Sequence, residues 1–185
     1  MIAVLLAAAS AWWQARTTVR PVADAAFPFV AVCRVVAVDD GDSFVFAPHE
    51  GPDAVPGRIR VRLHAVDAPE LVQRDGPPAR DALAALTHGH VVQIDCYKRD
   101  PRGRAVCRVR LGSGAGERDP ELELLHRGLV WHFRAFAAEQ RPADRQRYAA
   151  AEADARDKRR GLWHRDDAMP PWACRERLRS AQACD

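Results

Sequence analysis

The sequence has few lysines, methionines and cysteines, and it has no long apolar run. Only two of its 28 basic residues are lysine, an imbalance that we attribute first to a GC-rich coding sequence. Because no run of about 20 apolar residues is present, a standard membrane-spanning helix is not expected. Five cysteines are too few for a small domain built on a disulfide framework, and their odd number leaves at least one unpaired in a monomer. The cysteines lack zinc-site spacing and the seven histidines show no metal-ligand pattern, so a zinc site is not expected either.

The length and composition are those of a single globular domain. The chain has 185 residues, of which 48% are hydrophobic and 29% charged, and it contains neither internal repeats nor low-complexity tracts. The net charge of +3 arises entirely within residues 141–185, which is a weak indication of an anionic partner. A solvated helix face is the commoner explanation of such a bias. Composition therefore predicts the size of the fold and leaves the function open.

The N-terminal residues resemble an export signal or a membrane anchor. Ile2–Trp13 is apolar apart from Ser10, which matches the apolar region of a signal peptide and is too short for a membrane span. No basic residue precedes this run, whereas Arg16 and Arg20 follow it, which is the reverse of the charge order expected for export. We expect export to the periplasm or the extracellular space, or membrane association through this segment. A helix packed on its own domain, in a cytoplasmic protein, is the alternative.

From residue 29 onward, the pattern is one of short strands interrupted and followed by helices. Arg58–Ala65 alternates arginine with apolar residues at a period of two, which is typical of a strand with one apolar face. The expected strands are 30–38, 43–47, 58–65, 91–98 and 104–111, and the expected helices open at Pro77, Pro120 and Pro142. This order predicts an α+β protein, a five-stranded Greek-key β-barrel of the oligonucleotide-binding (OB) type with three helices packed around it.

Four short segments concentrate charge at expected turns, where an apolar core would not require it. These segments are Asp39–Ser43, Arg62–Glu70, Asp100–Arg104 and Arg159–Trp163. The chain also carries, in order, Gly128-Leu129-Val130-Trp131, Ala151-Glu152 with Ala155-Arg156, and Pro171-Trp172 with Arg175. Together these motifs resemble the staphylococcal nuclease (thermonuclease) family over about residues 30–175. The Arg-x4-Asp-x-Pro-Glu piece is the most specific of them.

The resemblance implies a five-stranded OB barrel and Ca²⁺-dependent hydrolysis of phosphodiester bonds in DNA and RNA. Asp42 and Asp67 match the two calcium carboxylates of the family, and Ala68 occupies the position whose backbone carbonyl contributes a third oxygen. Glu70 matches the glutamate that is placed to activate the attacking water. Two arginines of this chain match those that grip the reacting phosphate, Arg62 and Arg104.

The chemistry of these residue types supports the same division of roles. Ca²⁺ prefers carboxylate, carbonyl and water oxygens in loose geometry, and two carboxylates from separate turns suit it. Guanidinium groups meet phosphate oxygens through paired hydrogen bonds and stabilise the charge that develops during attack. A carboxylate such as Glu70 can accept the proton of a nearby water, a step typically worth about 10²–10⁴-fold in rate.

Each of these residues also has an ordinary structural explanation. Asp42 and Asp67 could be turn aspartates, because aspartate is common in hairpin turns. Glu70 could be a surface charge or the cap of a following turn. Arg62 could belong to the exposed face of a strand, and Arg104 to a hairpin surface. These explanations would have to hold together at five positions with the spacing of the family.

Two departures from the family's pattern affect the expected contacts with substrate. Arg102, preceded by Pro101, stands where the family has a tyrosine beside the active site. Phe136 stands near the position of another family tyrosine, so one hydroxyl is lost. We expect Arg102 and Phe136 to contact the substrate with an altered grip on the nucleotide.

If the chain is exported, its cysteines can form disulfides. Cys96 and Cys107 lie on opposite strands of an expected hairpin, about equally far from its turn, and form the first candidate pair. Two buried thiols are the alternative. Cys174 and Cys184 form a weaker candidate pair, and Cys33 would then be left over.

The sequence thus predicts three segments and one main function. The segments are an export or anchor segment at 1–28, a nuclease-like domain at 29–175 and a C-terminal tail at 176–185. The main hypothesis is a Ca²⁺-dependent nuclease for DNA and/or RNA, with little sequence specificity because phosphate contacts do not read bases. We expect a monomer without a stable protein partner. A catalytically weak or inactive nucleic-acid-binding module is the alternative, and a protein-binding barrel is supported only by the modest charge.

Overall fold

The computed structural model describes residues 27–48 and 57–184. The expected export or anchor segment at 1–28 therefore lies almost wholly outside the described residues, as does most of the loop expected at 47–57. Within the described ranges, no helix combines the length and the apolar character needed to cross a membrane.

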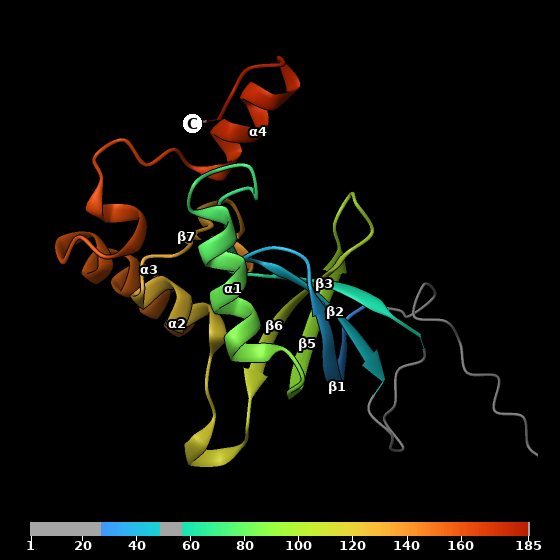
Figure 1. Cartoon of the computed structure of the whole chain (residues 1–185). Coiled ribbons are helices and arrows are strands. Elements are labelled where there is room, and N and C mark those ends of the chain that lie inside the picture. Colours follow the sequence, from blue (N-terminus) through green and yellow to red (C-terminus); the bar gives the residue numbers. More distant parts are fainter. Residues whose placement is uncertain (1–26, 49–56, 185) are drawn as a thin grey trace, which may run out of the picture.

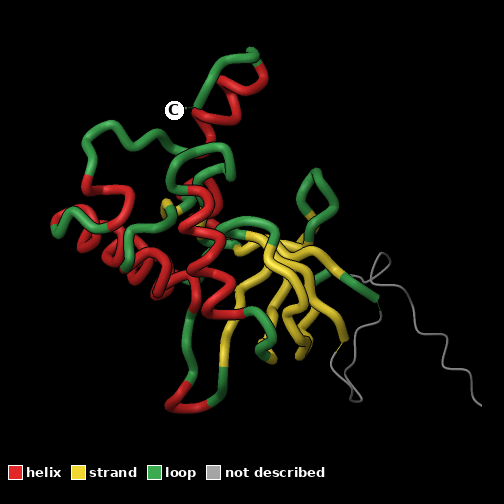
Figure 2. The backbone as a smooth tube through the Cα atoms, viewed as in Figure 1, coloured by secondary structure: helices red, strands yellow, loops and turns green. Residues whose placement is uncertain are grey.

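A closed five-stranded barrel forms the centre of the structure (Figure 1, Figure 2). Its strands are β1 (Phe29–Val38), β2 (Ser43–Pro48), β3 (Ile59–Leu63), β5 (Val91–Arg99) and β6 (Ala105–Leu111). They follow one another around the barrel in the order β1-β2-β3-β6-β5, and β1 closes the barrel by pairing with β5. Neighbouring strands are antiparallel except β3 and β6, which run parallel. The expected five-stranded barrel is confirmed.

Alternating burial explains why these segments form strands. In β1, Ala31, Cys33 and Val35 are buried, whereas Val32 and Arg34 between them are exposed. Successive side chains of a strand point to opposite faces, so the apolar set of each strand fills the inside of a small barrel. Other strands contribute Phe44, Phe46, Val61, Leu63, Ile94 and Val109 to the same core.

Two disulfides join cysteines of the described chain. Cys96 and Cys107 are direct partners across β5 and β6, and they are bonded to each other. Cys174 is bonded to Cys184, and Cys33 remains a buried free thiol. The second bond joins Cys174, in the expected nuclease-like domain, to Cys184, in the expected tail.

The described residues contain four α-helices, one more than expected, and Figure 1 shows them on one side of the barrel, with α4 away from the strands. They are α1 (Gly76–Thr87), α2 (Pro120–His126), α3 (Pro142–Asp157) and α4 (Pro171–Arg179). Each has proline in its first turn, where the missing N–H costs no intrahelical hydrogen bond. The helix α4 runs across the expected boundary between residues 175 and 176, and residues 176–179 are helical.

Short elements complete the fold beside the barrel. β4 (Val66–Asp67) pairs with β7 (Trp131–His132) in a separate two-stranded sheet, and the 3₁₀ helix η3 (Arg134–Glu139) follows β7. Two further 3₁₀ helices are η2 (Gly114–Gly116) and η4 (Gly161–His164). Because β4 pairs with β7, the segment that follows β3 lies against the segment that precedes η3, at one end of the barrel.

Candidate active site

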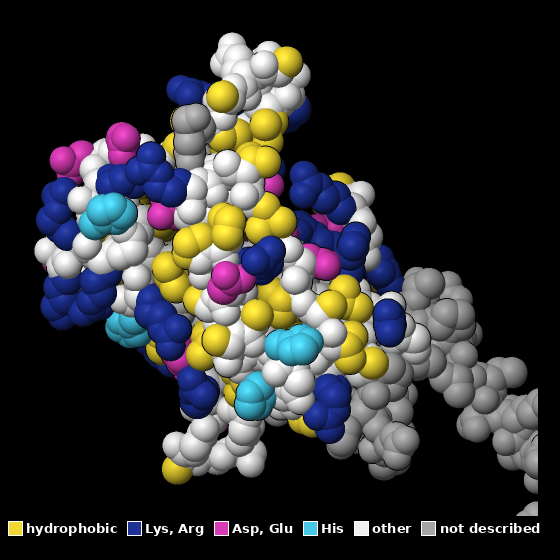
Figure 3. Space-filling model, viewed as in Figure 1, with side chains coloured by type: hydrophobic (Ala, Val, Ile, Leu, Met, Phe, Trp, Pro, Cys, Tyr) yellow, Lys and Arg dark blue, Asp and Glu magenta, His cyan; other side chains and the backbone are white. Residues whose placement is uncertain are grey.

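An open cleft of about 400 Å³ lies between the turn joining β5 to β6 and helix α4. Figure 3 shows basic side chains gathered over the β5–β6 turn. Most of the residues expected in the site line this cleft: Asp42, Arg62, Ala68, Glu70, Arg102, Arg104 and Phe136. Asp67 is fully buried below the lining. The structure therefore brings together side chains that are far apart in the sequence.

Asp42 enters the cleft from the tight turn between β1 and β2. The carboxylate of Asp40 accepts a hydrogen bond from the Asp42 N–H over 3.0 Å, which closes the turn. Gly41 lies so close to Ala68 and Ala79 that a Cβ on Gly41 would come within 2.7 Å and 2.6 Å of their Cβ atoms. Glycine at this position allows the turn that carries Asp42 to press against the segment that carries Ala68.

Asp67 lies beside Asp42 at the end of β4. The small sheet pairs Asp67 with Trp131 of β7, and the Asp67 side chain has no exposed surface. The next residue, Ala68, donates its backbone N–H to the Asp42 carboxylate over 3.1 Å. Two carboxylates from separate turns therefore meet at the floor of the cleft.

Arg62 bridges these two carboxylates. Its Nη1 donates to Asp42 Oδ2 over 2.8 Å, and its Nη2 donates to Asp67 Oδ1 over 2.9 Å. The guanidinium carbon lies 5.5 Å from the centre of the Phe133 ring. Burial alone would lower the pKa of Arg62, but the charges of Asp42 and Asp67 outweigh it and raise the pKa. The buried guanidinium therefore stays charged.

Arg60, two residues earlier on β3, has the exposed position that the alternating pattern of this strand predicts. Its side chain is 66% exposed and pairs with Asp39 at the surface over 3.0 Å. Arg62 would share this outer face by alternation, yet only 8% of its side chain is exposed. The carboxylates at the end of β3 account for the difference, because they cover Arg62 and pair with it.

Arg104 reaches the cleft from the base of the β5–β6 turn. Its Nε donates to Asp100 Oδ2 over 2.8 Å, and its Nη1 lies 3.8 Å from Asp42 Oδ1. Asp100 Oδ1 accepts the backbone N–H groups of Arg102 and Arg104, each over 2.9 Å. Burial alone would raise the pKa of Asp100, but the hydrogen bonds from Arg104 and Arg102 lower it. Asp100 is thus an ionised anchor for Arg104.

Glu70 lies at the edge of the cleft, in the turn that precedes α1. Gln73 holds this turn twice: its backbone N–H donates to the Glu70 carbonyl over 2.8 Å, and its side-chain oxygen accepts the Glu70 N–H over 2.8 Å. A Cβ on Gly76 would overlap the Glu70 carbonyl, so this close approach requires glycine. The Glu70 side chain is 30% exposed, which leaves it open to water.

Arg175 of α4 also reaches these carboxylates, and the sequence assigned it no role. Its Nη1 donates to Glu70 Oε1 over 2.8 Å and to Asp67 Oδ1 over 3.2 Å. Its Nη2 donates to Asp67 Oδ2 over 2.7 Å. The only signal in the sequence was its place after Pro171-Trp172 in a family-like motif, because a residue 108 positions away from Asp67 cannot be placed by spacing.

The aromatic side of the cleft comes from the segment after β7. Phe136 of η3 packs edge-on against Phe133, with ring centres 4.7 Å apart. The ammonium of Lys98 lies 4.1 Å from the centre of the Phe136 ring. Arg102 also lines the cleft and is exposed at the tip of the β5–β6 turn. The two residues expected to contact substrate thus line one cleft.

The oxygen atoms at the cleft floor are of the type that a hard divalent cation prefers, and one of them has no hydrogen-bond partner. Asp42 Oδ1 is buried and makes no hydrogen bond to any described residue. Burial raises the pKa of Asp42 to about 7, against the lowering effect of Arg62, and a cation beside it would favour the ionised form. Within residues 27–48 and 57–184, no group of three His, Cys, Asp or Glu side chains could hold a metal ion. A cation would therefore need Asp42, Asp67 and backbone, water or substrate oxygens together.

The fold and the cleft define a small barrel that presents guanidinium groups, a buried carboxylate pair and an accessible glutamate, an arrangement suited to an anionic substrate. The sequence model of the family described as staphylococcal nuclease homologue matches residues 60–165. The chain belongs to the staphylococcal nuclease family.

Three relatives illustrate the similarity. A micrococcal nuclease of Shigella flexneri is 32% identical over 154 residues, which cover 80% of this chain and 82% of the relative. Protein ParB of Escherichia coli is 31% identical over 179 residues, which cover 94% of this chain and 86% of that protein. A probable staphylococcal-like nuclease of Oryza sativa subsp. japonica is 31% identical over 131 residues, which cover 71% of this chain but only 24% of the rice protein.

Proposed function

We propose that this protein is a Ca²⁺-dependent nuclease that hydrolyses phosphodiester bonds in DNA and/or RNA with little sequence specificity. One observation carries the proposal: Arg62, Arg104 and Glu70 share a cleft whose floor holds the paired carboxylates of Asp42 and Asp67. Family membership and a relative named as a micrococcal nuclease support the same reaction.

The two arginines provide the phosphate-binding part of the reaction. Arg62 Nη1 lies 2.8 Å from Asp42 Oδ2, and Arg104 Nη1 lies 3.8 Å from Asp42 Oδ1. A phosphate bound above the carboxylates would therefore contact both guanidinium groups. Planar guanidinium groups bind phosphate oxygens in pairs of hydrogen bonds. Their contacts strengthen as negative charge develops on the phosphorus oxygens, which lowers the barrier.

Glu70 is placed to accept a proton from the attacking water. Its carboxylate is open to solvent at the edge of the cleft, whereas Asp42 and Asp67 are buried. As the water oxygen bonds to phosphorus, its proton passes to Glu70 and the bond from phosphorus to the leaving oxygen breaks. Ca²⁺ held by Asp42, Asp67 and the Ala68 carbonyl would supply positive charge beside the phosphate.

The walls of the cleft support the expected lack of sequence specificity. Phe136 contributes an aromatic ring to the lining of the cleft, and base stacking on such a ring does not depend on which base is present. Arg102 offers a charge suited to a backbone phosphate. Neither contact reads the edge of a base, and phosphate contacts carry no sequence information.

The disulfides support the further proposal that the chain is exported. Cys96–Cys107 and Cys174–Cys184 would persist in an oxidising compartment such as the periplasm or the extracellular space. The test is to express the full chain with a C-terminal tag, to determine the compartment in which the tagged protein is recovered, and to sequence its N-terminus. Recovery of the intact chain in the cytoplasm alone would contradict export.

Cleavage of labelled oligonucleotides tests the main proposal. Single- and double-stranded DNA and RNA are incubated with Ca²⁺, Mg²⁺ or EDTA, and the product ends are identified. We expect cleavage with Ca²⁺, none with EDTA, and a loss of about 10²-fold or more in Glu70→Gln and Glu70→Ala. The matched control is Glu117→Gln, an exposed glutamate outside the cleft, which should cleave like the wild type. Binding of oligonucleotides without turnover, unchanged in Glu70→Gln, would indicate the alternative, a non-catalytic nucleic-acid-binding barrel.

A further inference from the structure

Arg175 occupies a position that the proposed reaction does not explain. It makes three charge-assisted hydrogen bonds, two to Asp67 and one to Glu70. Asp67 is a proposed metal ligand and Glu70 the proposed proton acceptor, so a single guanidinium connects the two functions. Such bonds are about twice as strong as hydrogen bonds between neutral groups.

The guanidinium of Arg175 is itself a cation bound to Asp67. Asp67 Oδ2 accepts from Arg175, and Asp67 Oδ1 accepts from both Arg175 and Arg62. The carboxylate is fully buried between these two arginines. A metal ion that binds Asp67 therefore meets a positive charge already paired with the same oxygens, and the two cations repel each other.

Glu70 gains orientation from the same contact. Its backbone is held by Gln73, whereas its side chain is partly exposed and forms an ion pair with Arg175. A free glutamate side chain samples several rotamers, and the ion pair restricts Glu70 to one that points toward Arg175. A misplacement of about 1 Å in a catalytic group can cost about 10²-fold in rate.

The position of Arg175 is set by two contacts of α4 with the rest of the fold and by a disulfide within the C-terminal segment. The side-chain nitrogen of Gln73 donates to the carbonyl of Met169, just before the helix, over 2.9 Å. Trp172 meets Trp131 edge-on, with ring centres 5.4 Å apart. Cys174, next to Arg175 in the chain, is buried and bonded to Cys184.

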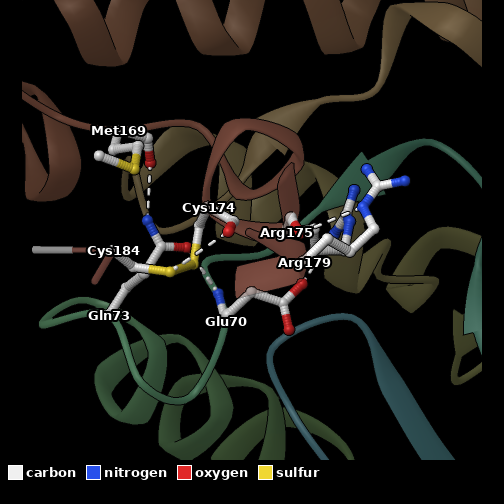
Figure 4. The surroundings of a disulfide bond; sticks show 7 residues. All are labelled: Glu70, Gln73, Met169, Cys174, Arg175, Arg179 and Cys184. Carbon is white, nitrogen blue, oxygen red and sulfur yellow. Dashed lines mark hydrogen bonds and ion pairs between the residues drawn. A yellow bond between two sulfur atoms is a disulfide. The ribbon is translucent and has the colours of Figure 1, made fainter. Parts of the chain in front are cut away.

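Figure 4 shows the disulfide beside the turn that carries Glu70 and Gln73, with the side chains of Glu70 and Arg175 pointing toward each other. Gln73 contacts the Glu70 N–H through its oxygen and Met169 through its nitrogen. The turn and the helix are therefore linked both by Gln73 and by the ion pair. The family-like Pro-Trp-x-x-Arg sequence places Trp172 and Arg175 on one helix for these two contacts.

We propose that Arg175 is a positioning residue that orients Glu70 relative to Asp67 and competes with the metal ion for Asp67. The proposal rests on the proposed function. It predicts that loss of Arg175 moves two measured quantities in opposite directions: turnover falls, because Glu70 loses its orientation, while Ca²⁺ binds more tightly, because a competing cation is removed.

The test compares Arg175→Ala with the wild type in oligonucleotide cleavage and in calorimetric titration with Ca²⁺ in the absence of substrate. We expect kcat to fall at least about tenfold with little change in KM. We expect the Kd for Ca²⁺ to fall by about fivefold. In Arg175→Lys the charge remains but the planar fork is lost, so kcat should fall while the Kd for Ca²⁺ stays near that of the wild type.

Two further variants separate positioning from simple support of the fold. Arg177→Ala removes an exposed arginine of the same helix that does not line the cleft, and both quantities should be unchanged. The double variant Cys174→Ser/Cys184→Ser keeps Arg175 but loosens α4, so it should shift kcat and the Kd for Ca²⁺ in the directions of Arg175→Ala. This variant also provides the test if Arg175→Ala does not fold.

The outcomes are distinguishable. If wild-type protein cleaves and Arg175→Ala cleaves equally well, the role of Arg175 is refuted and the proposed function stands. If Arg175→Ala loses turnover and also binds Ca²⁺ more weakly, Arg175 only supports the fold, and the proposal is wrong. Failure of the wild type to cleave with any metal contradicts the proposed function instead, and the calorimetric comparison still decides whether Arg175 competes for the cation.

Discussion

Arg62 Nη2 lies 2.9 Å from Asp67 Oδ1 at the floor of the cleft, and 8% of the Arg62 side chain and 0% of the Asp67 side chain are exposed. A surface ion pair contributes little to stability, because water competes for both charges. A buried pair is different, since removing one partner leaves the other charge without compensation in a poorly solvated site. The pair is therefore required by the fold as well as by the proposed reaction.

Substitution of Arg62 should separate these two roles. Arg62→Lys keeps a charge near Asp42 and Asp67 but cannot bridge them, so turnover should fall by about 10²-fold. Arg62→Ala should in addition lower the free energy of unfolding by about 3–5 kcal/mol, because buried Asp42 loses its nearest cation and buried Asp67 keeps only Arg175. Urea unfolding and cleavage assays measure the two effects. The matched control is Arg60→Lys on the exposed face of β3, and an equal loss of turnover there would contradict the assignment.

A methyl group at Gly76 should displace the catalytic turn. A Cβ there would overlap the Glu70 carbonyl, so Gly76→Ala forces the turn away from α1. We expect turnover to fall by about 10²-fold, since about 1 Å of displacement has that effect. We also expect a loss of about 1–3 kcal/mol in stability from overpacking. Gly116→Ala is the control, because nothing lies within 4 Å of a Cβ at Gly116. Wild-type turnover in Gly76→Ala would show that the position of Glu70 does not matter.

The buried pair of His64 and Glu121 should make stability depend on pH. His64 Nδ1 lies 2.8 Å from Glu121 Oε2, and Glu121 Oε1 accepts the Ala65 N–H. Burial alone would lower the pKa of His64, but Glu121, and more weakly Asp119, raise it above the usual value, against the effect of Arg108. The folded protein therefore holds this proton more tightly than the unfolded chain does.

The sign of the effect follows from this raised pKa. The stabilisation is fully present below about pH 6.5, the ordinary histidine pKa, and is lost as the pH rises through the higher pKa of folded His64. Urea midpoints measured between pH 5.5 and 9 should fall with pH in the wild type and less in His64→Gln. His90→Gln, at an exposed histidine, should retain the wild-type slope. A midpoint that rises over this range in the wild type and is level in His64→Gln would refute the assignment.

The Cys96–Cys107 bond should contribute stability without contributing to catalysis. It closes a short loop between direct partners on β5 and β6, and neither cysteine lines the cleft. Replacing both cysteines by alanine should lower the free energy of unfolding by about 3 kcal/mol. Turnover per folded molecule should stay within about twofold of the wild type, because substitutions at well-separated sites act nearly independently of one another. A large loss of turnover would show that the hairpin positions Arg104 through this bond.

Much of the barrel was predictable from the sequence because local periodicity reports on burial. The alternation in residues 58–65 identified β3, and the apolar residues of β1 and β2 identified neighbouring strands. The family-like motifs also selected Asp42, Asp67 and Glu70, and the structure places all three at one cleft. The fourth helix was not predicted; α4 has proline in its first turn as the other three helices do, but it spans only nine residues, three of which are arginine.

The spacing of residues along the sequence could not predict which charged side chains pair with one another in the cleft. Strand alternation gave Arg62 an exposed position, and only the β4–β7 sheet shows that Asp67 comes to lie against it. The close approaches of Gly41 to Ala68 and of Gly76 to Glu70 are likewise contacts between different turns. Such contacts depend on how elements pack, which no single segment encodes.

The sequence by itself determined the barrel, the family-like motifs and the residue types available for phosphate chemistry, because strand periodicity and turn composition are local properties. Only the tertiary structure decided that Arg175 of α4 binds the same carboxylates as Arg62. The physical reason is that a charged side chain is stabilised by whichever opposite charges the fold buries beside it. Arg62 lies on β3, Asp67 on β4, Glu70 in the turn before α1 and Arg175 on a disulfide-bonded helix. The chain brings these elements together only when it folds.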